Sequence, residues 1–180
     1  MIDALQFTVQ LSSRSGSVTL RRARLDDLAA LMALLADDPI SAARGDQADA
    51  ADTPAYARAL AELIEDPSNE ILLVADDARV VATMQLTRIP GMARRGSTRL
   101  LVEAVRVAAD QRSSGIGSAM MRWVTDVAAP TIGSSLVQLT SDEARVDAHR
   151  FYERLGFVGS HRGFKYPIGE ARPARAGTRP

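Results

Sequence analysis

The chain has 180 residues, of which 46% are hydrophobic, and this length suits one well-filled core better than two marginal ones. Its 22 basic and 22 acidic side chains cancel, so we expect no general attraction to nucleic acid or to an anionic membrane surface. The sequence has no cysteine and only two histidines. This composition excludes a disulfide framework, a thiolate nucleophile and a cysteine-ligated zinc site, and it disfavours a histidine-based metal site.

The sequence predicts neither a signal peptide nor a membrane-spanning segment. Residues 1–16 include an early acidic side chain and no continuous apolar stretch, unlike a signal peptide. The longest fully apolar run, 28–36, is far shorter than the roughly 18 residues that a membrane span needs. We therefore expect a cytoplasmic protein with a flexible leader at 1–16, one domain at 17–168, and a disordered tail at 169–180.

The first half of the domain predicts a strand followed by two helices. Residues 18–22 read as a short strand, and apolar residues then recur at helical spacing over 28–35. A long loop at 37–52 is rich in aspartate, alanine, glycine and serine. The next helix begins at Thr53-Pro54, a cap residue with a first-turn proline, and ends before Pro67.

Strands dominate the middle of the chain. Residues 71–75 and 80–87 flank a short polar turn and predict a hairpin. The run 98–109 is apolar enough for a central strand.

The last third alternates helices and strands. A helix follows residue 115, a strand follows at 135–140, and a second helix at 146–155 is closed by Gly156. Residues 157–166 predict a final hairpin. The order of all elements indicates an α/β (mixed α+β) fold, in which a mixed sheet is covered by helices on both faces.

The turn between the central strand and the next helix has the composition of an anion cradle. It consists of Arg112, Ser113, Ser114, Gly115, Ile116 and Gly117. Its glycines remove side chains at a helix N-terminus, where backbone N–H groups lack intrahelical partners, and this suits a pyrophosphate. The arginine and the hydroxyls, including that of Ser118, add donors.

One other interpretation of this turn remains open, and two nucleotide-binding motifs fit it less well. A plain strand-to-helix turn with two glycines would also fit. The phosphate loop of an NTPase needs a lysine directly after the glycine, where this chain has Ser118, and a dinucleotide fingerprint needs a third glycine where Met120 stands.

A second motif lies downstream, at 148–157, and reads Ala-His-Arg-Phe-Tyr-Glu-Arg-Leu-Gly-Phe. A long strand, Arg-x-x-Gly-x-Gly, a helix and then this motif resemble the GCN5-related N-acetyltransferase (GNAT) superfamily, and its bacterial small-molecule members most. The resemblance covers roughly residues 18–166. It implies a twisted mixed sheet of about six to seven strands flanked by about four helices, with direct acetyl transfer from acetyl-CoA to a primary amine and no metal.

The resemblance also implies how acetyl-CoA is held. The pantetheine arm would pair with the backbone of Val105 and Val107, on either side of Arg106, and the pyrophosphate would lie on the turn. His149 could contact the CoA backbone, although a packing or surface role is more common for such a histidine. The family's frequent asparagine seven residues before the motif tyrosine is Arg145 here, so that contact does not carry over.

Two residues are candidates for the chemistry. Tyr152 matches the family tyrosine that protonates the departing thiolate, and its alternative role is packing. Glu103, on the central strand, matches a glutamate that takes the amine proton through water, and burial would raise its pKa toward a useful value. Its alternative role is an ion pair with Arg99 or Arg106.

Three further side chains are weaker candidates. We interpret Asp142 and Glu143 as residues of a helix start, and His161 as a minor candidate for the base.

Two alternatives to a small-molecule acetyltransferase remain. One is an enzyme that acetylates a protein lysine or N-terminus, with loop 37–52 as a groove wall. The other is a non-catalytic acyl-CoA sensor or assembly module. The family resemblance also leaves room for a homodimer.

Overall fold

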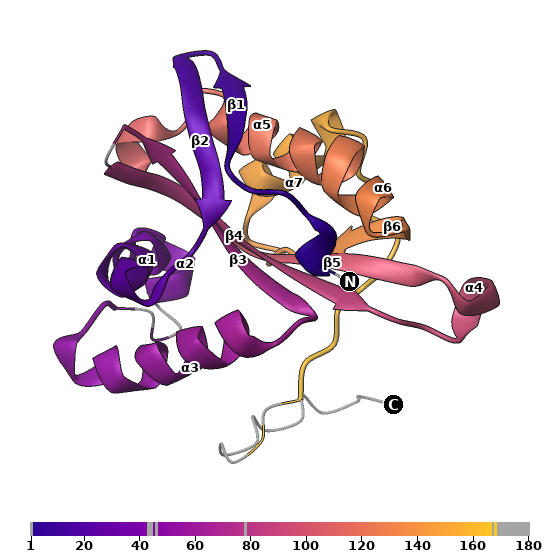
Figure 1. Cartoon of the computed structure of the whole chain (residues 1–180), viewed down its shortest axis with the longest axis horizontal. Helices are drawn as coiled ribbons and strands as arrows, with labels where there is room; N and C mark the ends of the chain where they lie inside the picture. Colours follow the sequence, from indigo (N-terminus) through magenta and orange to yellow (C-terminus); the bar gives the residue numbers. More distant parts are fainter. Residues whose placement is uncertain (1, 43–44, 46, 78, 167, 169–180) are drawn as a thin grey trace, which may run out of the picture.

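The computed structural model describes residues 2–42, 45, 47–77, 79–166 and 168, and its centre is a six-stranded sheet whose strands lie in chain order (Figure 1). The strands are β1 (Val9–Ser13), β2 (Gly16–Arg22), β3 (Asn69–Asp76), β4 (Arg79–Ile89), β5 (Thr98–Val107) and β6 (Ser134–Leu139). Neighbours are antiparallel, except β5 and β6, which are parallel. The predicted mixed sheet is thereby confirmed.

Helices lie on both sides of this sheet (Figure 1). They are α1 (Leu28–Ala36), α2 (Pro39–Ala42), α3 (Thr53–Glu65), α5 (Ile116–Trp123), α6 (Ala129–Thr131) and α7 (Val146–Arg154). The short segment α4 (Ala93–Gly96) connects the ends of β4 and β5 (Figure 1), and its Arg94 and Arg95 have left-handed φ values. α1 and α3 contact one face, and α5 packs on the other. Residues Val124–Ala128 continue α5 as a π-helix, and α6 follows it directly, so that Pro130 lies near the C-terminal end of one continuous helical stretch.

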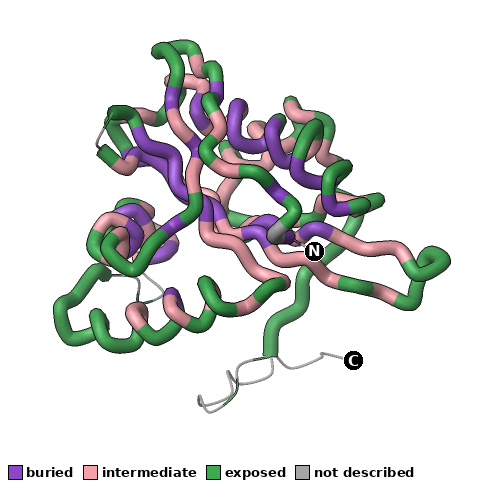
Figure 2. Tube along the Cα trace, viewed as in Figure 1, coloured by how far each residue is buried: buried purple, intermediate pink, exposed green. Residues whose placement is uncertain are grey.

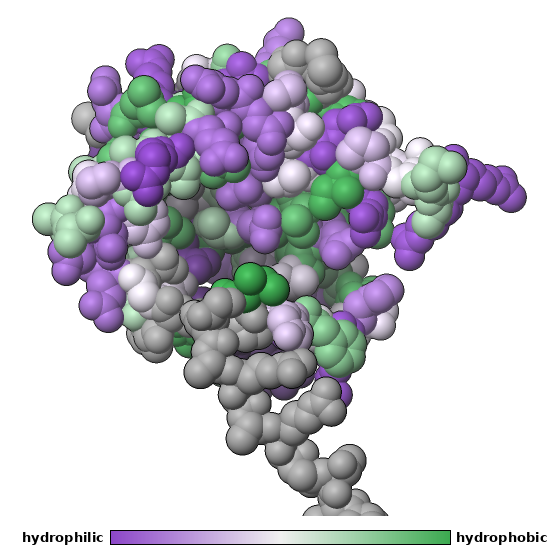
Figure 3. Space-filling model, turned by 90° about the horizontal axis from the view of Figure 1, so that it is seen from below, coloured by the Kyte–Doolittle hydropathy of each residue, from purple (hydrophilic) through white to green (hydrophobic). Residues whose placement is uncertain are grey.

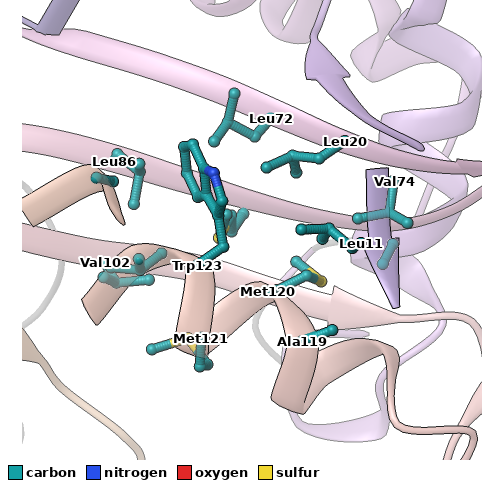
Figure 4. Packing of buried hydrophobic residues seen from close by; sticks show 14 of the residues in the cluster. Leu11, Leu20, Leu72, Val74, Leu86, Val102, Ala119, Met120, Met121 and Trp123 are labelled. Atoms are coloured by element: carbon teal, nitrogen blue, oxygen red, sulfur yellow. The ribbon is translucent and has the colours of Figure 1, made fainter. Parts of the chain in front are cut away.

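The main core lies between the sheet and α5. Trp123 projects from α5 toward Leu72, and Met120 lies beside Leu11 (Figure 4). The tube in Figure 2 shows the same pattern, with burial concentrated in the central strands and α5. A smaller cluster on the opposite face joins α1 and α3 to the sheet. Each layer therefore buries its own apolar stripe, as the periodicity predicts.

The prediction of a flexible leader is wrong for the described part of residues 1–16. β1 pairs with β2, and Ile2, Leu5 and Leu11 are only 1%, 4% and 6% exposed. Phe7 packs on Trp123 with ring centroids 5.8 Å apart. These apolar side chains complete the main core beside α5, because burying them removes apolar surface from water.

The prediction of a final hairpin is also wrong. Residues 157–166 form no strand, and Val158 and Phe164 are 83% and 89% exposed. Their side chains meet no second layer that would compensate for the ordering of a hairpin. The predicted tail at 169–180 lies outside the described residues.

Hydrophilic side chains cover much of the lower face of the molecule, with smaller groups of apolar side chains between them (Figure 3). Among the described residues, no helix combines the length and the apolar character that a bilayer crossing requires.

Candidate functional site

The second half of β5 has a neighbouring strand on one side only, within the described chain. β5 and β6 pair from Thr98 as far as Val102, which lies beside Leu139. Beyond that point β5 continues against β4 alone and ends at Val107, opposite Ala82.

The backbone of this half-strand presents polar groups to the open side. The N–H of Ala108 donates to the carbonyl of Val81 on β4 at 2.9 Å. The backbone N–H and C=O groups of successive residues in a strand point to opposite sides, so those of Val105 and Val107 point away from β4. The Val105 carbonyl accepts from the Arg106 side chain at 2.8 Å and the Val107 carbonyl accepts from Arg112 at 3.2 Å. An extended chain can therefore pair with this edge chiefly through its N–H groups.

Gly115 caps the N-terminus of α5 in a conformation that favours glycine. Its φ is +94°, and a Cβ built there would lie 3.1 Å from the backbone nitrogen of Arg14. Arg14 also donates its N–H to the carbonyl of Ser114 at 2.8 Å. The β1–β2 turn therefore packs directly against this turn, which the expectation of a flexible leader did not foresee.

Arg112 is occupied by contacts within the protein. Its guanidinium donates to the carbonyl of Val107 at 3.2 Å and to the backbone and carboxylate of Asp37 at the end of α1. Arg112 therefore has a structural role, since its guanidinium charge is already paired with the Asp37 carboxylate. Its contact with a phosphate stays a prediction.

Gly117 marks the point where β5, α5 and α7 meet. A Cβ at this position would lie 3.4 Å from the Phe151 ring and 3.7 Å from Val107. Tyr152 follows Phe151, with ring centroids 5.1 Å apart and the rings near perpendicular. The two sequence motifs, although far apart in the chain, are thus neighbours in space.

The phenol of Tyr152 is in a protected environment. Burial raises its pKa above the usual value, while the charges of Arg106 and Arg145 act in the opposite direction. The group is therefore protonated at neutral pH and can donate a hydrogen bond.

Sequence reasoning missed a polar cluster that ties α2 to β5 and α7. Both terminal nitrogens of the Arg145 guanidinium, Nη1 and Nη2, donate to the Asp38 carboxylate, at 2.6 and 2.5 Å. Arg106 donates to the Ser41 hydroxyl at 2.5 Å, and Arg145 reaches the same hydroxyl at 3.3 Å. The residue that departs from the family pattern, Arg145, is thus the centre of this cluster. No local spacing signals it, because Asp38 and Arg145 lie far apart in sequence.

The Asp38 carboxylate is strongly stabilised as an anion. Partial burial opposes its ionisation, but hydrogen bonds from Arg145 and from the backbone and hydroxyl of Ser41 outweigh this, so the pKa of Asp38 lies well below its usual value. The cluster therefore keeps its charge pairing at neutral pH.

The expectation that Glu103 is buried is wrong. Glu103 lies on β5 opposite Gln85, and its side chain is exposed. Among the salt bridges of the described residues, none joins it to Arg99 or Arg106. The Glu103 carboxylate is therefore accessible to solvent and to a ligand.

The remaining candidates lie at the rim. His149 forms a 2.8 Å hydrogen bond through Nε2 with the carbonyl of Asp142, whose carboxylate accepts from the N–H of Ala144. Glu143 lies 3.8 Å from Arg162, and exposed His161 bonds only its neighbour Ser160 among described residues. Ser118 is half-buried in the first turn of α5.

Comparison with known proteins decides the family. A family model described as acetyltransferase (GNAT) matches residues 28–157. The chain belongs to the GNAT family. No curated protein matches it significantly.

Solved structures with a similar fold support this assignment. A transcriptional regulator from Bacillus halodurans C-125 is 36% identical, with a TM-score of 0.79, and the match covers 84% of this chain and 99% of that one. A putative acetyltransferase from Agrobacterium tumefaciens is 23% identical, with a TM-score of 0.69 and coverage of 83% and 99%. A ribosomal-protein-alanine N-acetyltransferase from Brucella melitensis is 20% identical, with a TM-score of 0.65 and coverage of 84% and 99%. The last two show the shared fold.

GNAT proteins use acetyl-CoA as the acyl donor, and the site fits such a group. The left-handed glycine at the α5 N-terminus leaves backbone N–H groups of the first turn for phosphate oxygens. At the edge of β5 the carbonyls of Val105 and Val107 already accept from the Arg106 and Arg112 side chains, so the backbone N–H groups of this edge are what suit the amides of an extended arm. In the described part of this GNAT chain, no group of three or more histidine, aspartate or glutamate side chains is placed to hold a metal.

Proposed function

We propose that the protein is an acetyl-CoA-dependent N-acetyltransferase that acts directly on the primary amine of a small molecule. The observation that carries the proposal is the meeting of β5, α5 and α7 at Gly117. It brings the anion cradle, the open strand edge and the tyrosine motif into one place.

The cofactor-binding residues act mainly through the backbone. Val105 and Val107, with Arg106 between them, would hold the pantetheine arm, and the turn from Arg112 through Ser113, Ser114, Gly115, Ile116 and Gly117 would hold the pyrophosphate. Ser118 and His149 are the flanking candidates. When bound, acetyl-CoA supplies an activated acyl group as a thioester.

Glu103 is the proposed base. An alkyl amine with a pKa near 10 is protonated at pH 7, and removing that proton costs about 4 kcal/mol. The exposed carboxylate on β5 can attract the ammonium group and accept its proton through a water molecule. Backbone N–H groups at the β5 edge can then stabilise the charge that develops on the acyl oxygen.

Tyr152 is the proposed acid. Full transfer of a proton from a phenol of pKa about 10 to a thiolate of pKa about 8.5 is uphill by about 2 kcal/mol, and burial of Tyr152 increases this cost. Arg106 and Arg145 reduce it by stabilising negative charge nearby. Tyr152 therefore contributes chiefly a hydrogen bond to the leaving sulfur, which accelerates the reaction without being indispensable.

The test is thiol release from acetyl-CoA across a panel of primary amines, together with calorimetry of CoA binding. Amine-dependent release with a new N-acetyl product by mass spectrometry is the expected result. Binding of CoA without release for any acceptor would contradict the proposal and favour an acyl-CoA sensor.

A regulatory role has one specific observation in its favour. The Bacillus halodurans relative, which is 36% identical, is described as a transcriptional regulator. The same assay separates the two roles, and a lysine-containing peptide in the panel tests protein acetylation.

A further inference from the structure

The two helices on one face of the sheet enclose an apolar pocket of about 110 Å³. α1 and α3 contribute Leu28, Leu31, Met32, Tyr56, Leu60 and Leu63 to its walls. Both helices lie against the sheet on this side (Figure 1). One water molecule has a share of about 30 Å³ in the liquid, so this space exceeds the voids that ordinary packing leaves.

The sheet forms the remaining wall and supplies very little polarity. Thr83, Gln85 and Ala104 line the pocket. The Thr83 hydroxyl is already committed, since it donates to the carbonyl of Leu72 at 3.0 Å. The amide nitrogen of Gln85 donates to Asn69 at 3.2 Å, which leaves the Gln85 carbonyl oxygen as an acceptor for a ligand.

A bulge in β5 brings the proposed base to the rim of this pocket. Ala104 has a φ of +50°, and the strand register shifts at this point between β4 and β5. Glu103 is the register partner of Gln85. Directly opposed residues share a face of the sheet, so the Glu103 carboxylate lies on the pocket side, next to a lining residue.

We infer that the pocket receives the hydrocarbon part of the acceptor, which is therefore a primary amine with a short aliphatic tail whose ammonium group pairs with Glu103. The inference rests on the function proposed above. The order along β5 fits it, because Glu103 meets the amine, Ala104 lines the tail pocket and Val105 borders the cofactor edge.

The dimensions limit the tail. An apolar cavity of about 150 Å³ accepts benzene, so a pocket of about 110 Å³ suits a chain of about four carbons. Each methylene moved from water into such surroundings strengthens binding by about fourfold. A hydroxyl in the same place loses its hydrogen bonds to water and finds few replacements.

The first test is a homologous series from methylamine to butylamine, measured by thiol release from acetyl-CoA. We expect kcat/KM to rise by about fourfold for each added methylene. The hydroxyl analogue of equal length, 3-aminopropan-1-ol, should fall at least about tenfold below butylamine. Equal values for these two acceptors would overturn the inference.

The second test fills the pocket. Ala59 lines it from an exposed position on α3, so Ala59→Leu adds a side chain there with little risk to folding. We expect the preference for butylamine over methylamine to fall by about tenfold. Ala51→Leu adds the same side chain at an exposed position outside the lining and should keep the preference.

The outcomes separate this inference from the function on which it rests. Acetylation of amines with no effect of tail length or of Ala59→Leu would overturn the pocket assignment alone. CoA binding with no release from any amine would overturn both. Circular dichroism and the Kd for CoA confirm that each variant is folded.

Discussion

The two faces of the sheet carry the two halves of the proposed site, and they are built differently. On the α5 face the cofactor half consists mostly of backbone: a glycine with φ of +94° and the open edge of β5. On the α1 and α3 face the acceptor half consists of side chains around an apolar pocket. A backbone site requires particular glycines, whereas many combinations of apolar side chains can form a pocket. The first therefore leaves a motif in the sequence and the second does not.

The link between the halves is also made of side chains. Asp37 and Asp38, consecutive at the end of α1, hold Arg112 of the cofactor turn and Arg145 at the start of α7. A disturbance on the acceptor side can thus reach the cofactor side through this pair. The following experiments break one half or the other, or this link.

Loss of the Tyr152 hydroxyl should have the largest effect on the rate of acetyl transfer. We expect Tyr152→Phe to lower kcat by about 10²-fold with the Kd for CoA unchanged, because the phenol acts on the leaving sulfur and the ring keeps its packing. Steady-state thiol release and calorimetry measure the two quantities. Phe157→Leu controls for ring packing against Tyr152, and an unchanged turnover in Tyr152→Phe would remove the proposed role.

Loss of the Glu103 charge should have a smaller, pH-dependent effect. Glu103→Gln should lower kcat/KM by about thirtyfold at pH 7 and by much less near pH 10, where half of an alkyl amine is already neutral. A profile of kcat/KM from pH 7 to 10 measures this. Glu65→Gln, at an exposed position on α3, is the matched control. A loss that is equal at all pH values would assign Glu103 to binding rather than proton transfer.

A methyl group at Gly115 should weaken cofactor binding by about tenfold. Ala at φ of +94° is strained, and its Cβ would approach the Arg14 backbone at 3.1 Å, so the first turn of α5 must shift. Calorimetry with CoA measures the Kd. Gly163→Ala, where a Cβ meets nothing within 4 Å, should bind normally. Unchanged affinity in Gly115→Ala would show that the cradle does not depend on this conformation.

Loss of the Asp38 charge should have the smallest effect. We expect Asp38→Asn to lower the free energy of unfolding by about 1 kcal/mol at pH 7. The pKa of Asp38 is depressed in the folded protein, so its contribution is full above the unfolded value of about 3.9 and is lost as the pH falls through the folded value. Urea unfolding from pH 7 to pH 3 should therefore show a smaller acid-induced loss in the variant than in the natural chain.

Asp110→Asn is the control for this measurement, since it breaks an exposed pair with Arg79 and should leave stability unchanged. Identical acid profiles for the natural chain and Asp38→Asn would show that the cluster does not stabilise the fold.

Local patterns predicted most of the framework. The stripes of α1 and α3, the β3–β4 hairpin, β5, β6 and α7 with its closing Gly156 follow from periodicity and from cap residues. Periodicity failed at both ends of the domain. β1 is short, and its burial depends on contact with the distant helix α5, whereas Val158 and Phe164 carry apolar side chains that remain exposed.

The sequence by itself determined the resemblance to GNAT proteins through its two motifs. It also determined the mixed sheet and the position of the glycine turn, because those depend on spacing and on residue types that a local conformation requires. Tertiary structure alone decided the exposure of Glu103, the contacts of Arg112 and Arg145, and the pocket beside Ala104. Each of these depends on which distant segments meet. The ion pair between Asp38 and Arg145, and the packing of α1 beside α3 on one face of the sheet, leave no periodic trace in one chain, since contacts over long separations are set by the packing of whole layers.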